Sequence, residues 1–124
     1  MLDRVEIIRL TKKLNLPKGD YWVTAGAGLV LHGVKDRAAD IDIGCTTKVF
    51  DSLPKEAAFG LSSDGTRRAE LGGVFEFFEN WSVHEVVEID GVCVASQQSI
   101  KKQKAALGRP KDFEDIALIN ASTK

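Results

Sequence analysis

The chain has 124 residues, of which 44% are apolar, enough to close one hydrophobic core without disulfides or structural metals. Its 17 lysine and arginine residues nearly balance its 18 aspartate and glutamate residues, which excludes a long-range electrostatic attraction to nucleic acid or to an anionic membrane. No stretch approaches the roughly 20 apolar residues of a membrane span, and the charged N-terminal segment has no apolar signal-peptide core. We therefore expect one cytoplasmic domain over residues 1–124, with Cys45 and Cys93 as reduced thiols.

The first third of the sequence predicts alternating helices and strands. Apolar residues at three- and four-residue spacing indicate a helix that must end before Pro17, because proline breaks a helix. A β-branched and aromatic run then indicates a buried strand, which breaks into a turn at Gly26-Ala27-Gly28. Strict alternation around Asp40 and Asp42 indicates another strand, in which both carboxylates share one face. The expected elements are a helix over about 2–14, a strand over 21–25, a helix starting at 29–32 and a strand over 39–43.

The middle of the chain is expected to be rich in strands. Thr46 or Thr47 can cap a short helix through residue 53, which Pro54 prevents from continuing. Short apolar runs separated by Ser-Asp-Gly and Gly-Gly then indicate a meander, and Asp90-Gly91 is the strongest hairpin signal in the sequence. The expected strands cover 57–62, 67–71, 74–78, 83–89 and 92–94.

Two helices are expected at the C-terminal end. Ser96 or Ser99 can cap a helix that runs to Ala106 and closes at Gly108, and the last helix begins after Pro110. The whole order of elements predicts an α+β (α/β) fold, in which helices pack mainly on one side of a mixed β-sheet.

The segment that carries most chemical information joins the glycine turn to the two acids. Gly26 and Gly28 allow backbone N–H groups to approach a triphosphate, and a following helix N-terminus adds positive partial charge. Asp40 and Asp42 offer the hard oxygen ligands that Mg²⁺ prefers. Taken alone, the two acids also fit the solvent-facing side of an amphipathic strand. The dinucleotide fingerprint is excluded because Leu31 stands at its third glycine position, and the P-loop is excluded because no Gly-Lys-Ser/Thr follows.

This arrangement resembles the DNA polymerase β-like nucleotidyltransferase superfamily, and most closely its small stand-alone members related to antibiotic-modifying and toxin–antitoxin nucleotidyltransferases. The resemblance covers roughly residues 21 to 119 and implies a nucleotidyltransferase-like fold. The matching residues are Ala25-Gly26-Ala27-Gly28-Leu29, Leu31-His32-Gly33, Lys35 to Arg37, Asp40-Ile41-Asp42, Lys104, Arg109, Lys111-Asp112 and Asp115.

The sequence departs from the superfamily pattern at the first glycine and leaves the third acid open. Ala25 occupies the first glycine position, and no serine follows to hold a phosphate. Glu76 matches the third acid best, with Glu79 and Glu70 as alternatives. Strand alternation puts Glu76 and Glu79 on opposite faces, so only one of them can meet the aspartates. An inward Glu76 would act as a third metal ligand and as general base, as the superfamily's third acid does.

The resemblance implies a Mg²⁺-dependent enzyme that moves a nucleoside monophosphate from an NTP such as ATP to a hydroxyl, releasing pyrophosphate. The acceptor stays open among a protein side chain, an RNA end and a small molecule, and a homodimer or a partner protein could complete its site. The implied site residues are Asp40, Asp42 and Glu76 for metal and catalysis, Gly26 and Gly28 for phosphates, and Lys104 or Arg109 for the triphosphate.

Other readings of the same residues remain open. The fold could be retained as a binding or regulatory module, for instance an antitoxin-like partner, which the short chain and the altered first motif favour. It could also bind a nucleotide without transferring it. Arg109, Lys111 and Asp112 could simply form a helix cap with ion pairs, and His32 could be a helix-end residue whose ring is hydrogen-bonded.

Overall fold

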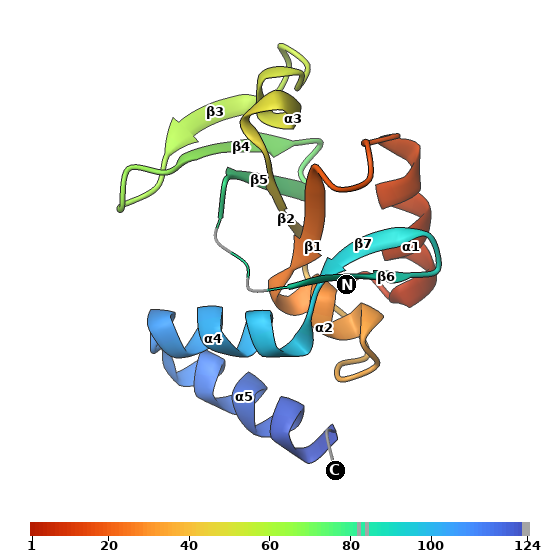
Figure 1. The fold of residues 1–124 in the computed structure, drawn as a ribbon, viewed down its shortest axis with the longest axis vertical. Helices are drawn as coiled ribbons and strands as arrows, with labels where there is room; N and C mark the ends of the chain where they lie inside the picture. The colour runs from red at the N-terminus through yellow and green to blue at the C-terminus, as the bar shows by residue number, and fades with distance from the viewer. Residues whose placement is uncertain (82, 84, 123–124) are drawn as a thin grey trace.

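The computed structural model describes residues 1–81, 83 and 85–122 of the chain (Figure 1). The helices within these residues are α1 (Arg4–Lys13), α2 (Ala25–Leu31), α3 (Thr47–Asp51), α4 (Gln97–Leu107) and α5 (Pro110–Ser122). The strands are β1 (Tyr21–Thr24), β2 (Ile41–Cys45), β3 (Ala58–Leu61), β4 (Arg67–Leu71), β5 (Phe75–Glu79), β6 (Val86–Ile89) and β7 (Val92–Ala95).

The strands form one mixed seven-stranded sheet in the order β3-β4-β5-β2-β1-β7-β6. β2 lies at its centre, antiparallel to β1 and parallel to β5. β3, β4 and β5 form the antiparallel meander that the turn signals predicted, and β1 pairs parallel with β7. The sequence-based expectation of an α+β fold with a mixed sheet is therefore confirmed.

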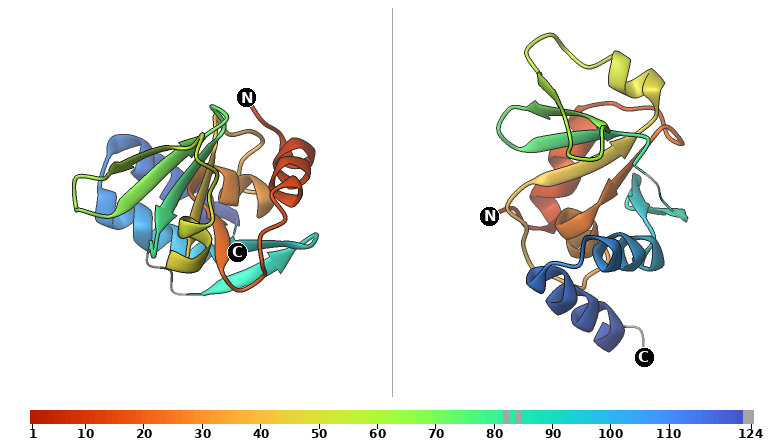
Figure 2. Two further views of the ribbon diagram at one scale, coloured as in Figure 1. Left: turned by 90° about the horizontal axis from the view of Figure 1, so that it is seen from above. Right: turned by 90° about the vertical axis from the view of Figure 1, so that its left-hand side faces the viewer.

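The main core lies on one face of the sheet. Alternate residues of the central strands, including Ile43 and Phe77, are fully buried there. Ile7 of α1, Val30 of α2 and Phe50 of α3 belong to the same cluster. The paired helices α4 and α5 lie on the other side of the sheet from α1 (Figure 2, left). Their contact with the sheet is a second apolar cluster of Trp22, Leu29, Ala95, Ile100 and Ile119.

Several ends of helices and strands were predicted correctly from capping and turn residues. Thr46 Oγ1 accepts a hydrogen bond from the Val49 backbone N–H at the start of α3, and the Ser96 hydroxyl does the same for Ser99 at the start of α4. Gly108 ends α4 with a left-handed φ of 64°. Asp90-Gly91 forms the two-residue turn between β6 and β7, with positive φ at both residues.

The start of α2 differs from the expectation. The helix begins at Ala25 instead of near residue 29, so Gly26 and Gly28 lie inside it and not in a turn before it. Ala25 makes the whole strand-to-helix turn by itself, with a left-handed φ of 54°. Burial of α2 against the sheet and α4 overrides the low helix propensity of the glycines.

Two expected strands begin two or more residues later than the sequence predicted. β2 begins two residues later than expected, so Asp40 precedes the strand and Asp42 lies in it. β6 starts at Val86, whereas the sequence predicted a strand from residue 83; residues 82 and 84, including His84, lie outside the described residues. The structure buries both cysteines as free thiols. Among the helices described, none has the length and apolar character needed to cross a membrane.

Candidate active site

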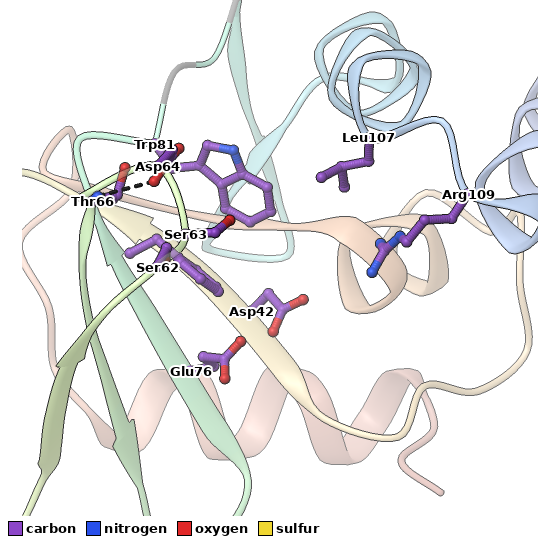
Figure 3. Close-up of a pocket in the computed structure, with 10 residues that line it drawn as sticks. Asp42, Ser62, Ser63, Asp64, Thr66, Glu76, Trp81, Leu107 and Arg109 are labelled. Atoms are coloured by element: carbon purple, nitrogen blue, oxygen red, sulfur yellow. Dashed lines mark hydrogen bonds between the residues drawn. The ribbon is translucent and has the colours of Figure 1, made fainter.

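The parallel pairing of β2 and β5 brings two carboxylates together. Asp42 and Glu76 are partners in the register of these strands, so both side chains project from the same face of the sheet. Figure 3 shows the two carboxylates next to each other. Glu79 instead accepts hydrogen bonds from Arg67 and Thr47 and does not line the cavities around Asp42. Of the acids that the sequence left open, Glu76 is the one in register with Asp42.

The electrostatics of this cluster are unfavourable for a negative charge on Asp42. Burial raises the pKa of Asp42 to about 7, and the negative charges of Asp40 and Glu76 act in the same direction. Lys104 and Lys111 lower this pKa, but their effect is smaller. The cluster is therefore short of positive charge.

Arg68 on β4 partly supplies that charge. Its Nη2 donates to Glu76 Oε2 and to Glu70 Oε1, both at 2.5 Å, and so ties the two glutamates together on the open face of the meander. Within residues 1–81, 83 and 85–122, no three acidic, histidine or cysteine side chains stand in an arrangement ready to hold a metal ion. Arg68 occupies one oxygen of the acid that would complete such a set.

A cavity of about 290 Å³, here called the basic cavity, opens between the acids and the helices α2 and α5. Arg37 and Lys111 line it, and neither forms an ion pair with any residue that the structure describes. Gly26, Asp40 and Asp42 line the same cavity. Unpaired cations and carboxylates line the same cavity. Such a site suits a polyanion that binds together with a metal cation.

Lys104 and Arg109 also line the basic cavity but are bound to acids of α5. Lys104 Nζ lies 2.8 Å from Asp115 Oδ2, and Arg109 Nε donates to Asp112 Oδ2 at 2.7 Å. The hydrogen bonds from Arg109 lower the pKa of Asp112. Burial raises the pKa of Asp115, but the ion pairs with Lys104 and Lys35 outweigh it, so the net shift is downward. The sequence analysis offered a helix cap with ion pairs as an alternative role for Arg109 and Asp112. The structure shows such an ion pair between these two residues.

A second cavity, of about 270 Å³ and here called the aromatic cavity, is also lined by Asp42 (Figure 3). The rings of Phe78 and Trp81 form its apolar wall, with centroids 4.6 Å apart. The β3–β4 loop, Leu107, Glu76 and Arg109 complete the lining, and the loop contributes Ser62, Ser63, Asp64 and Thr66. Asp42 and Arg109 line both cavities.

This arrangement of strands and helices recurs in a solved structure of known activity. The aminoglycoside nucleotidyltransferase ANT(2")-Ia, solved in complex with adenylyl-2"-tobramycin, superposes with a TM-score of 0.60 over 95% of this chain and 86% of its own, at 19% sequence identity. The chain has the nucleotidyltransferase fold. A candidate nucleotidyltransferase from Thermotoga maritima gives a TM-score of 0.58 over 94% of this chain and 93% of its own, at 20% identity.

Comparison of structures found similar proteins, whereas comparison of sequences did not. No protein-family model matches the chain, and no curated protein sequence matches it. The nucleotidyltransferase fold was thus detectable from the motif residues and from the structure, but not from overall sequence similarity.

Gly26 and Gly28, which the sequence predicted as phosphate contacts, have different surroundings in the structure. Gly26 lines the basic cavity, and a Cβ built on it would meet only the Ala38 Cβ, at 3.8 Å. A Cβ on Gly28 would lie 2.8 Å from Ile100 Cδ1 and 3.3 Å from the Val23 carbonyl oxygen. Gly28 is therefore needed for close packing of α2, and we do not retain it as a phosphate contact.

Sequence reasoning missed some residues of this site. Arg37 and Lys111 were matched to the nucleotidyltransferase pattern but not proposed as phosphate contacts, although a basic loop before Asp40 was the available signal. Arg68 had no local signal, because its role depends on the pairing of β4 with β5. His32, at the end of α2, is the hydrogen-bonded helix-end residue that the sequence analysis offered as an alternative. Its Nε2 lies 2.8 Å from the Ala95 carbonyl oxygen.

Proposed function

We propose that this protein is a Mg²⁺-dependent nucleotidyltransferase that transfers a nucleoside monophosphate from an NTP, ATP in the first instance, to a hydroxyl. The observation that carries the proposal is that Asp40 and Asp42 line the cavity that holds Arg37 and Lys111, while Glu76 is in register with Asp42. The fold is that of ANT(2")-Ia, whose structure contains an adenylylated product. We further propose that the reaction occurs in the cytoplasm, in keeping with the two free thiols.

The acids fit a divalent metal ion by their chemistry. Asp40, Asp42 and Glu76 all offer oxygen ligands, as Mg²⁺ requires, and the pKa of Asp42 is raised first by burial and then by the negative charges of Asp40 and Glu76. These three residues would hold the ion, with Glu76 sharing its carboxylate with Arg68. When bound, Mg²⁺ supplies neutralisation of charge on the phosphates and on the transferring centre.

The residues of the basic cavity would bind the triphosphate. Arg37 and Lys111 form no ion pair with any residue that the structure describes, so their charges are available to phosphate oxygens. Gly26 leaves the α2 backbone open on the side facing this cavity. Lys104 and Arg109 would contribute charge at the rim while they hold α5 in place through Asp115 and Asp112.

The transfer itself requires one proton acceptor. The acceptor oxygen attacks the α-phosphorus, the bond from that phosphorus to the pyrophosphate oxygen breaks, and the hydroxyl proton passes to the Glu76 carboxylate. Glu76 lines the aromatic cavity, and Arg68 fixes its orientation there. Positioning and charge compensation provide most of the rate in such a reaction, so few side chains suffice.

Calorimetry with each NTP in the presence and absence of Mg²⁺ tests the proposal. The wild-type chain is expected to bind an NTP only with Mg²⁺, and Asp42→Asn is expected to lose this binding. Asp90→Asn, which removes an exposed carboxylate at the β6–β7 turn, serves as the matched control and should bind normally.

Two outcomes would contradict the proposal. Absence of Mg²⁺-dependent binding in the wild-type chain would remove the enzyme, and binding that needs neither Mg²⁺ nor Asp42 would indicate a nucleotide binder without transfer chemistry. Binding without release of pyrophosphate in the presence of a broad panel of hydroxyl compounds would favour the regulatory module over the transferase.

A further inference from the structure

Glu70 and Glu76 face each other across the pairing of β4 and β5. They are direct partners in the antiparallel register, so both side chains project from the same face of the sheet. Carboxylates that stand directly opposite each other repel and destabilise a strand pair. This position therefore requires a cation.

Arg68 is that cation. It lies two residues before Glu70 on β4, so its side chain projects from the same face. Its Nη2 donates to Glu70 Oε1 and to Glu76 Oε2, at 2.5 Å in each case. Because one nitrogen serves both carboxylates, a small movement of the guanidinium group favours either partner.

The two glutamates differ in their surroundings. The Glu70 side chain is 56% exposed, whereas the Glu76 side chain is 26% exposed. Glu76 is in register with Asp42, and the residues that line a small cavity of about 170 Å³ include Asp40, Glu70 and Glu76. Glu76 thus belongs to the acids proposed to hold a metal ion, while Glu70 offers Arg68 a partner on the solvent side.

Arg68 competes with a divalent ion for the Glu76 carboxylate. Two cations that share one carboxylate lie within a few ångströms of each other, and their repulsion is strong in a partly buried site. The repulsion falls if Arg68 shifts its hydrogen bonds from Glu76 toward Glu70. The second carboxylate therefore decides how easily Glu76 can become a metal ligand.

We propose that Arg68 and Glu70 are positioning residues that act on the metal site through Glu76. Arg68 neutralises Glu76 until Glu76 becomes a metal ligand, and then shifts its charge toward Glu70. Glu70 makes this shift favourable because its carboxylate lies at the same distance from the Arg68 nitrogen. The inference rests on the proposed function, because it concerns the acids that would hold Mg²⁺ there.

Binding of Mn²⁺ to the full chain without nucleotide, measured by calorimetry, tests the competition. Mn²⁺ accepts the same carboxylate ligands as Mg²⁺. Arg68→Gln removes the competing charge and should tighten Mn²⁺ binding about tenfold, whereas Arg68→Lys keeps the charge and should bind like the wild type. Arg67→Gln is the matched control: Arg67 is the neighbour of Arg68 on β4 but pairs with Glu79 and Asp51, so Mn²⁺ binding should not change.

A double-mutant cycle tests the part played by Glu70. Glu70→Gln leaves Arg68 with Glu76 as its acid and should weaken Mn²⁺ binding about tenfold. In the Arg68→Gln background the same change should weaken it at most about threefold, because an exposed charge then acts only through solvent. Glu56→Gln removes an exposed charge between α3 and β3 and should leave Mn²⁺ binding unchanged.

Thermal unfolding gives a second measurement. Arg68→Gln leaves Glu70 and Glu76 opposed without their cation, so its melting temperature without added metal should fall below that of the wild type. Mn²⁺ should raise the melting temperature of this variant more than that of the wild type, because binding to the folded state is tighter. A loss that Mn²⁺ does not reverse would indicate a merely structural role for Arg68.

The outcomes separate this inference from the proposed function. Unchanged or weaker Mn²⁺ binding by Arg68→Gln would overturn the inference and leave the metal site in place. An equal effect of Glu70→Gln in both backgrounds would overturn it as well, because Glu70 would then be a metal ligand itself. Arg68→Gln with lower affinity for ATP but unchanged affinity for Mn²⁺ would make Arg68 a phosphate ligand instead. If neither the wild type nor any variant bound Mn²⁺, the metal site of the proposed function would fall, and this inference with it.

Discussion

Gly26 and Gly28 stand two residues apart in α2 but differ in what a methyl group would meet. Gly26→Ala has space for its Cβ and should raise the free energy of unfolding by about 0.5 to 1 kcal/mol, because alanine is the better helix former. Gly28→Ala would collide with Ile100 and should lower it by about 1 to 3 kcal/mol. Denaturant unfolding measures both changes. If Gly26 also faces the triphosphate, Gly26→Ala should weaken NTP binding despite its higher stability.

Ala25 is the residue that turns the chain from β1 into α2. Its left-handed φ of 54° is unfavourable for any residue with a Cβ, and glycine stands at this position in the superfamily pattern. Ala25→Gly is expected to raise the free energy of unfolding by about 0.5 to 1 kcal/mol, since the relief of strain exceeds the extra entropy of the unfolded chain. Thermal unfolding measures the gain; a loss of stability would show that Ala25 is not strained.

The ionised carboxylate of Asp42 is expected to lower the free energy of unfolding at neutral pH. Its pKa of about 7 in the folded protein lies above the ordinary value of 3.8, so the folded chain holds the proton more tightly. The ionised carboxylate therefore destabilises the fold increasingly as the pH rises from about 4 to about 7. Asp42→Asn should raise the unfolding free energy by about 2 kcal/mol near pH 8 and hardly at all near pH 4. Equal gains at both values would contradict this account, and Glu56→Gln should show neither.

At the scale of the elements, α4 and α5 are joined by a polar network and an apolar contact. Asp112 is fully buried between Lys104 and Arg109, while Ile100 and Ile119 belong to the second apolar cluster. The network explains why two short helices keep a fixed position at the edge of the basic cavity. The acids of the network also compensate the positive charge of Lys104, which is buried although it lines the basic cavity.

This network should make the protein acid-sensitive. The pKa values of Asp112 and Asp115 are lowered in the folded state, so their stabilisation is complete above the ordinary value of 3.8 and is lost as the pH falls below it. Denaturant unfolding between pH 7 and pH 2 should show this loss in the wild-type chain. Asp112→Asn should be less stable by about 2 kcal/mol near pH 7 and should lose less on acidification. A parallel acid loss in both proteins would place the effect elsewhere.

Several elements were predictable because their signals are local. The Asp90-Gly91 hairpin, the Thr46 and Ser96 caps and the Gly108 helix end follow from backbone conformations that only a few residue types favour. The start of α2 was not predictable in this way. Its first residues are Ala-Gly-Ala-Gly, a sequence that reads as a turn until the sheet and α4 cover it.

At the scale of the whole molecule, the edge of the sheet formed by β3 exposes apolar side chains. β3 is the outermost strand, and Phe59 and Leu61 on it are 54% and 68% exposed. Such an edge can pair with a second copy, in keeping with the homodimer that the sequence left open. Leu61→Lys should reduce concentration-dependent association in light scattering without lowering the melting temperature. Val5→Lys, at an equally exposed position on α1, should not reduce it, and a loss of association in both would argue against the edge.

By itself the sequence determined the α+β class, the order of the elements, most of their caps and turns, and the pair of acids at the start of one strand. These features depend on residues within a few positions of one another, through hydrogen bonds and side-chain periodicity. Only the tertiary structure decided that β5 pairs with β2, which places Glu76 beside Asp42, that Gly28 serves packing, and that Arg37 and Lys111 stay unpaired. The pairing of distant strands and the matching of distant charges depend on how the whole chain closes, and no local pattern encodes that choice.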